Sequence, residues 1–305
     1  MIRERVLVLG NAGLDITLRL PRLPSKGETL LGEGTGSAPG GKGLNQAVAA
    51  ARAGAQVIFH APIGHDAQGN EIAAALAIEE FTLLDVRRMP YPSDYSLLMV
   101  LPDGENSIAS AGSCAAALTE ADAKAFAANA RPGDVFVLQG NLTRAATKAA
   151  LIEAQKQGAT TLLNPAPLWW DVEPLMPFCG IVVANRGEAE TITGLSDPED
   201  AAKALCNLGA SLVIITLGAD GCFTFDRKGT GHYYSAPQVD AIDTTGCGDT
   251  FCGVFAAMLA MGKDCAGAID LAQGAASLTA QRMGAFTALP KREEFMALLA
   301  QNEGR

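Results

Sequence analysis

Short apolar runs alternate along the chain with longer alanine-rich stretches in which apolar residues recur at helical spacing. The short runs predict buried strands at residues 5–10, 56–61, 134–139, 159–163, 180–184 and 211–216. The longer stretches predict helices at 42–53, 67–79, 119–129, 143–157, 197–208, 247–262, 264–282 and 291–301. Strands that alternate with helices are typical of a doubly wound α/β fold, in which helices flank a mainly parallel sheet.

Two segments break this rhythm and predict a small separate sheet. Residues 15–38 and 93–112 contain few helix formers and are rich in Gly, Ser and Thr, and the second segment predicts a β-hairpin with its turn at Pro102-Asp103-Gly104. A sheet that projects beside the carboxyl ends of the main strands would cover a ligand crevice. The predicted division is a core of residues 1–14, 39–92 and 113–305, with a β lid of residues 15–38 and 93–112.

Composition narrows the class of protein. A chain of 305 residues with 49% hydrophobic residues can bury one large core, and a net charge of −10 disfavours an extended nucleic-acid surface. The seven cysteines form no CxxC pair, which argues against a disulfide framework or a zinc site. The apolar stretch at residues 6–9 is too short for a signal peptide, and no run approaches a membrane span. We therefore expect a cytoplasmic protein that binds small molecules.

The most informative segment is Asp243-Thr244-Thr245-Gly246-Cys247-Gly248-Asp249, which leads into the predicted helix 247–262. Its two glycines let backbone N–H groups converge, and a helix N-terminus adds partial positive charge, so Gly246, Cys247 and Gly248 would form a cavity for an anion. Asp249 at its edge could accept the proton of an attacking hydroxyl. Simple capping of the helix by Asp249 and Thr250 is the alternative, but the paired glycines favour phosphoryl transfer.

This segment resembles the D-T-x-x-x-G-D signature of the ribokinase-like, PfkB-type carbohydrate kinases, and Gly40-Gly41-Lys42-Gly43-Leu44-Asn45-Gln46-Ala47 resembles their G-G-K-G-x-N-Q-A motif. The resemblance implies the ribokinase-like fold and an ATP-dependent sugar kinase with Asp249 as general base. It makes D-ribose, converted to D-ribose 5-phosphate, the first expected acceptor. Another furanose, a polyol or a nucleoside is the alternative, and a catalytically silent sugar-binding protein is a further one.

The resemblance also implies a sugar site. Adjacent glycines bring the backbone close to a polyol, Lys42 and Asn45 supply donors, and Asp15 would accept bonds from two sugar hydroxyls. Two positions depart from the family pattern, because Gly13 replaces an Asn and Asn141 replaces a Glu. Both changes remove or weaken contacts to sugar hydroxyls, so the acceptor stays open. The implied substrate-binding residues are Asp15, Gly41, Lys42, Asn45, Asn141 and Asp249.

Further similarities concern the nucleotide and its cations. Asn185-Arg186-Gly187-Glu188 resembles the family's N-x-x-E motif, which implies Mg²⁺ near Glu188, held largely through water. The run from Thr216 to Gly221 resembles a loop that borders the nucleotide. A helix cap and a plain strand-to-strand turn are the respective alternatives. The implied nucleotide-binding residues are Asn185, Glu188, Thr216, Gly218, Gly221 and Gly248, and Asp243, Thr245 and Gly284 are the residues implied for a K⁺ site with K⁺ as an activator.

Other interpretations fit the residues less well. The run from Gly36 to Gly43 matches G-x-x-x-x-G-K of a P-loop, but Gly43 stands where Ser or Thr would hold Mg²⁺. A dinucleotide-dependent oxidoreductase would need G-x-G-x-x-G after the first strand, where the chain has only Gly10-Asn11-Ala12-Gly13. An exposed edge of the small sheet could pair with its copy, so we also expect a homodimer through the lid.

Overall fold

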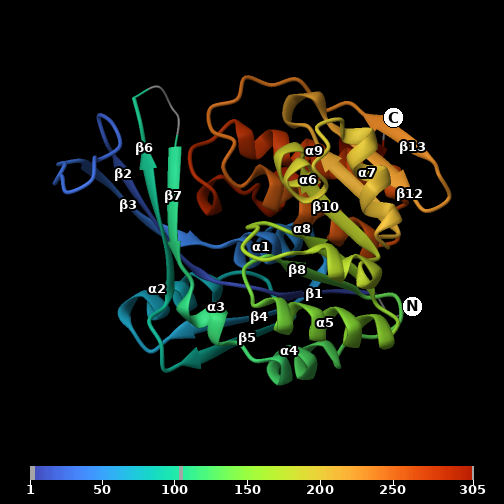
Figure 1. The fold of residues 1–305 in the computed structure, drawn as a ribbon, viewed down its shortest axis with the longest axis horizontal. Helices are drawn as coiled ribbons and strands as arrows, with labels where there is room; N and C mark the ends of the chain where they lie inside the picture. The colour runs from blue at the N-terminus through green and yellow to red at the C-terminus, as the bar shows by residue number, and fades with distance from the viewer. Residues whose placement is uncertain (1–3, 103–105, 304–305) are drawn as a thin grey trace.

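The computed structural model describes residues 4–102 and 106–303. A nine-stranded sheet runs through the molecule with helices on both of its faces, and a four-stranded sheet stands to one side (Figure 1). This architecture confirms the predicted α/β class with a large, mainly parallel sheet and a second, smaller one. None of the helices formed by the described residues is long and apolar enough to cross a membrane.

The large sheet has the strand order β13-β12-β11-β10-β9-β8-β1-β4-β5, parallel from β5 to β11 and antiparallel beyond. Its central strands are buried on both faces because helices cover both, which explains their unbroken apolar runs. The strands are β1 (Arg5–Leu9), β4 (Gln56–Gly64), β5 (Leu83–Met89), β8 (Val135–Gln139), β9 (Thr160–Asn164), β10 (Ile181–Asn185), β11 (Leu212–Thr216), β12 (Cys222–Asp226) and β13 (Gly231–Tyr234).

Two hydrophobic cores lie on the two faces of this sheet. The helices that bury apolar side chains in the first core are α1 (Lys42–Arg52), α2 (Ala67–Leu76), α8 (Cys247–Ala260), α9 (Cys265–Ala280) and α10 (Arg292–Glu303). The second core is covered by α3 (Ser113–Ala117), α4 (Glu120–Ala127), α5 (Arg144–Lys156), the 3₁₀ helix η1 (Glu173–Phe178), α6 (Arg186–Thr193) and α7 (Pro198–Asn207). Two further 3₁₀ turns are η2 (Gly218–Asp220) and η3 (Phe286–Ala288).

The small sheet is made from the two segments that lack helix formers. It contains β2 (Gly13–Arg19), β3 (Glu33–Gly40), β6 (Asp94–Val100) and β7 (Asn106–Ala111), in the order β3-β2-β6-β7. β6 and β7 are antiparallel, as expected of a hairpin, although Asp103 and Gly104 of the predicted turn lie outside the described residues. Because β2 begins at Gly13 and β3 ends at Gly40, this sheet is joined directly to the segments that the sequence analysis connects with a sugar.

The predicted strands and helices of the core are all present, with ends shifted by a few residues at most. The prediction misses three strands, β5, β12 and β13, which lie at the two ends of the large sheet. β5 carries the polar run Arg87-Arg88 and buries only part of one face, so its apolar signal is weak. The short helices α3 and α6 are also absent from the prediction.

Candidate active site

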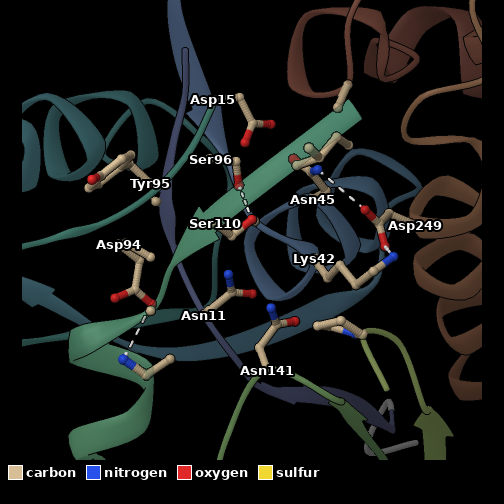
Figure 2. A pocket seen from close by; sticks show the side chains of 18 of the residues that line it. Asn11, Asp15, Lys42, Asn45, Asp94, Tyr95, Ser96, Ser110, Asn141 and Asp249 are labelled. Carbon is tan, nitrogen blue, oxygen red and sulfur yellow. Dashed lines mark hydrogen bonds and ion pairs between the residues drawn. The ribbon is translucent and has the colours of Figure 1, made fainter. Parts of the chain in front are cut away.

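A cavity of about 370 Å³ lies between the small sheet and the carboxyl ends of β1 and β8. Its walls come from β2, β6 and β7 on one side and from the first turns of α1 and α8 on the other (Figure 2). A second cavity, of about 180 Å³, shares Lys42, Gly246 and Asp249 with the first. These three residues therefore stand where the two cavities meet.

Asp249 lies in the first turn of α8, with only 6% of its surface exposed. Three donors reach its carboxylate from the first five residues of α1. Lys42 Nζ lies 3.5 Å from Oδ1, Gln46 Nε2 donates to Oδ1 at 3.0 Å, and Asn45 Nδ2 donates to Oδ2 at 3.4 Å. Figure 2 shows Lys42 and Asn45 pointing at Asp249. The two sequence motifs thus meet at one carboxylate, although Gln46 and Asp249 are 203 residues apart in the chain.

Close backbone contacts bring these helices together. A Cβ on Gly253 of α8 would lie 2.3 Å from the carbonyl oxygen of Gln46, so a larger residue there would push α8 away from α1. A Cβ on Gly43 would lie 2.7 Å from the backbone nitrogen of Asn11, which fixes α1 against the loop that follows β1. Glycines within and near the motifs therefore set the distance between the groups around Asp249.

The turn before α8 has the form of an anion site, with fewer free donors than the sequence suggests. Gly246 is the N-terminal cap of α8 and has φ 81°, a conformation that favours glycine. The N–H of Thr245 donates to Asp243 Oδ1 at 2.9 Å, and the N–H of Cys247 donates to Thr244 O at 3.2 Å. Within the described residues, the N–H groups of Gly246 and Gly248 have no acceptor. Of the three residues expected to form the anion cavity, the two glycines therefore have free donors and Cys247 does not.

The residues expected at a K⁺ site do come together. Both oxygens of the Asp243 carboxylate accept hydrogen bonds: the Thr245 hydroxyl donates to Oδ1 at 2.6 Å, and the Gly284 N–H donates to Oδ2 at 2.8 Å. Asp243 thereby ties the turn before α8 to the segment that follows α9. This position suits a residue that holds two loops in place around a cation.

The predicted sugar residues Asp15, Gly41, Lys42, Asn45 and Asn141 all line the larger cavity. Burial raises the pKa of the Asp15 carboxyl to about 6; the Ser96 hydroxyl opposes this rise, and the charge of Asp249 adds to it. Among the described residues, Oδ1 of Asn45 and Oδ1 of Asn141 are buried without a hydrogen-bond partner. Such acceptors suit the hydroxyl donors of a sugar.

Asp94 is a residue of this cavity that the sequence analysis misses. It pairs with Gly13 between β6 and β2, and a Cβ on Gly13 would lie 2.6 Å from Asp94 O. Its carboxylate accepts the N–H groups of Cys114 at 2.8 Å and Ala115 at 3.3 Å, and burial raises its pKa to about 7. The replacement of the family's Asn by Gly13 thus accompanies a close approach of β6 to β2. A lone Asp outside a motif gives no sequence signal for this pairing.

The predicted nucleotide residues line the other side of the site. Asn185 and Glu188 form a capping box at the start of α6, since Glu188 N–H donates to Asn185 Oδ1 at 2.8 Å and Asn185 N–H donates to Glu188 Oε2 at 2.9 Å. Both also line the smaller cavity with Thr216 and Gly248, so a capping role and a binding role are compatible. Among the described residues there is no cluster of three or more His, Cys, Asp or Glu that could hold a metal.

Gly218 and Gly221 border a third cavity, of about 330 Å³, which Asn185, Thr216 and Gly248 also line. The loop between them is the turn from β11 to the antiparallel β12, so the plain strand-to-strand turn is present as well. Most of the remaining wall is apolar, with Val239, Phe251 and Ala276 among its residues. An apolar slot beside an anion site has the character expected for a nucleotide base and its phosphates.

Comparisons with known proteins agree with this arrangement. The pattern of the pfkB family carbohydrate kinases matches residues 3–292. A ribokinase of Haemophilus influenzae is 34% identical over 304 residues, which cover 98% of this chain and 99% of that protein. The structure of a Thermotoga maritima ribokinase superposes with a TM-score of 0.87 at 26% identity and covers 97% of this chain and 99% of that one.

A structure of Arabidopsis thaliana ribokinase complexed with ribose and ATP has a TM-score of 0.86 and 28% identity, and it covers 98% of this chain and 99% of its own. The sequence match and the structural matches thus each span nearly the whole chain. They confirm the resemblance suggested by the two glycine-rich motifs. The chain therefore belongs to the PfkB family of carbohydrate kinases and is an ATP-dependent sugar kinase.

Proposed function

We propose that this kinase transfers the γ-phosphoryl group of ATP to D-ribose and forms D-ribose 5-phosphate. The observation that carries the proposal is the position of Asp249, whose carboxylate stands between a cavity with hydroxyl-binding groups and a cavity with free backbone donors. The similarity to ribokinases over the whole chain supports ribose as the acceptor.

In this proposal the sugar occupies the cavity of about 370 Å³. Asp15 accepts hydrogen bonds from two ring hydroxyls, and Asn45 and Lys42 donate to others. Gly41 allows the backbone to approach, and Asn141 takes the place of the family's glutamate. ATP lies across the two other cavities, with its base in the apolar slot and its phosphates beside the residues Asn185, Glu188, Thr216, Gly218, Gly221 and Gly248.

The reaction is an in-line displacement at the γ-phosphorus. As the sugar oxygen forms a bond to phosphorus, the bond from phosphorus to the bridging oxygen of ADP breaks, and the sugar proton passes to Asp249. Negative charge on the transferring group is met by the N–H groups of Gly246 and Gly248 and by Lys42 Nζ. We propose that the small sheet acts as a lid that excludes water and so suppresses ATP hydrolysis.

Two cations fit the residues present. Glu188 offers a single carboxylate at the smaller cavity, which suits Mg²⁺ held mainly by water and by the phosphates of ATP. Bound there, Mg²⁺ would neutralise phosphate charge. The contacts of Asp243 with Thr245 and Gly284 suit a K⁺ site built mainly from backbone carbonyls. K⁺ as an activator and a homodimer formed through a lid edge are further parts of the proposal.

A panel of acceptors tests the assignment of ribose. In an ADP-release assay with ATP and Mg²⁺, we expect kcat/KM for D-ribose to exceed the values for 2-deoxyribose, hexoses, polyols and adenosine by at least about tenfold. ADP release without any acceptor gives the background rate. A preference for another member of the panel would replace ribose by that acceptor, and no response to any of them would contradict the proposal.

One observation favours a nucleoside as the second candidate acceptor. Trp169 lines the larger cavity with 55% of its surface exposed, and the apolar residues Leu98 and Ile108 line the same cavity. An exposed indole at this place could stack on a base. If a nucleoside is the acceptor, Trp169→Ala should lower its kcat/KM by about tenfold or more and leave the value for ribose unchanged.

The raised pKa of Asp15 predicts how ribose binding depends on pH. The ionised carboxylate accepts two hydroxyl bonds and the protonated form accepts fewer, so affinity is full above about pH 7 and falls as the pH drops through about 6. Well below pH 6, the affinity for ribose should fall by about tenfold per pH unit. Calorimetric titration with ribose in the absence of nucleotide measures it. Asp15→Asn should bind weakly without this dependence, and a flat profile for the unchanged protein would contradict the assignment.

A further inference from the structure

We propose that Gln46 is a positioning residue for Asp249. In this proposal a buried chain of hydrogen bonds, from the Gln139 amide to the Gln46 amide to the Asp249 carboxylate, fixes the direction in which Gln46 donates. The inference rests on the proposed role of Asp249 as general base. Gln46 and Gln139 are both fully buried, and neither lines the three cavities described above. Gln46 therefore acts on the reaction through its neighbours, of which Asp249 is the nearest that lines the site and Asn164, at the smaller cavity, is the other.

The chain begins with the shortest of the three contacts to the carboxylate. Gln46 Nε2 lies 3.0 Å from Asp249 Oδ1, whereas the contacts of Lys42 and Asn45 are 3.5 and 3.4 Å long. Lys42 and Asn45 also line the larger cavity, where the hydroxyls of the substrate would compete for their N–H groups. Gln46 is thus the one donor of the three that stays on Asp249 when substrate binds.

The orientation of the Gln46 amide is fixed by its neighbours. Asn164 Nδ2 donates to Val183 O at 2.9 Å, and a carbonyl can only accept, so Asn164 must present its oxygen to Gln46. Gln46 Nε2 lies 3.3 Å from that oxygen. Since the ionised carboxylate of Asp249 also can only accept, both neighbours on this side require the NH₂ group of Gln46. An inverted amide would place oxygen against oxygen at two contacts.

Gln139 completes the chain from the opposite side. Its Nε2 donates to Gln46 Oε1 at 2.8 Å. Its own Oε1 has no partner among the described residues and lies against Gly10, where a Cβ would approach to 2.2 Å. Gln139 and Asn164 at the ends of β8 and β9 thus combine with Val183 of β10 to aim one N–H group of Gln46 at Asp249. Both the nitrogen and the oxygen of the Gln46 amide have partners in this network, which specifies a single arrangement of that side chain.

Gln46→Met tests the role, because methionine has a similar volume and cannot donate. We expect kcat to fall by about 10- to 100-fold, with KM for ribose and for ATP changed by less than about threefold, since neither substrate touches Gln46. A donor to a carboxylate favours its ionised form, so the acidic limb of the pH–kcat profile should also move to higher pH. A merely structural Gln46 would lower the melting temperature and leave that limb in place.

The double variant with Gln139→Met tests the chain. Gln139→Met alone should lower kcat by less than Gln46→Met does, and Gln46→Met/Gln139→Met should be no slower than Gln46→Met, because both act on the same contact. Additive losses would overturn the chain. A kcat for Gln46→Met within about threefold of the unchanged protein would overturn the role of Gln46. Should Gln46→Met fail to fold, the kcat and the pH profile of Gln139→Met decide whether the chain positions Asp249 or is merely structural.

Thr161→Val serves as a matched control for the loss of buried hydrogen bonds. Thr161 is buried in β9, its hydroxyl donates to Phe178 O at 2.7 Å, and it does not line the three cavities. This variant should melt at a lower temperature with an unchanged kcat. Ribose turnover by the unchanged protein is measured first. If ribose is not phosphorylated, the proposed acceptor is wrong, and the variants are assayed with the acceptor that the panel selects.

Discussion

Replacement of Asp249 by Asn is expected to lower kcat by about 10³-fold, within the range of 10²- to 10⁴-fold for loss of a general base. The substituted amide would keep the shape of the side chain and an oxygen that can accept from Gln46, but it takes no proton from the sugar hydroxyl at the pH of the assay. Because Asp15 and the other residues that line the larger cavity are unchanged, ribose and ATP should still bind with similar affinities. Steady-state kinetics and calorimetric titration with each substrate measure the two effects separately.

The matched control for Asp249→Asn is Asp270→Asn. Asp270 lies in α9 and is exposed, so the same chemical change should leave kcat and stability unaltered. Retention of more than about a tenth of the wild-type kcat in Asp249→Asn would remove the carboxylate from the role of base, since general bases contribute at least about 10²-fold. Loss of substrate binding in that variant would instead indicate that Asp249 holds the sugar.

Much of the fold follows from the sequence because most of its strands are buried on both faces. Val6, Leu7, Val8 and Leu9 are all fully buried, so the run carries its own signal without reference to the rest of the chain. The edge strand β13 shows the opposite case. Its residues Gly231, His232 and Tyr233 are exposed, and its pairing with β12 decides that it is a strand at all. Such elements depend on tertiary contacts that a local pattern does not carry.

The residues of the candidate site also divide into those that the sequence predicts and those that it does not. Residues in the glycine-rich motifs are predictable because the local spacing of Gly, Lys, Asn and Asp indicates which groups can bind a ligand together. Lys42, Asn45 and Asp249 do meet in space. Asp94 and Trp169 reach the same cavity through strand pairing and chain packing. The occupied N–H groups of Thr245 and Cys247 are likewise a matter of local hydrogen bonding that only coordinates reveal.

Gly246→Ala is expected to have the second large effect, a fall in kcat/KM for ATP of about 10²- to 10³-fold, as seen when donors to developing charge are lost. Gly246 has φ 81°, which L-residues rarely adopt, and a Cβ there would lie 3.0 Å from the Cα of Ala285. Both effects force the turn to move. Its N–H group and that of Gly248 then no longer converge on the transferring phosphoryl group. The variant should be less stable by about 1–3 kcal/mol.

Gly248→Ala separates the loss of this anion site from a general disturbance of the turn. Gly248 lies in the first turn of α8 with an ordinary φ, and no atom lies within 4 Å of the place its Cβ would take. Alanine should therefore fit without strain, keep the melting temperature, and put a methyl group into the cavity proposed for the phosphates. We expect a raised KM for ATP and a smaller fall in kcat/KM for ATP than in Gly246→Ala. If both variants kept wild-type kcat/KM, the free donors before α8 would not be the groups that meet the charge of the transferring phosphoryl group.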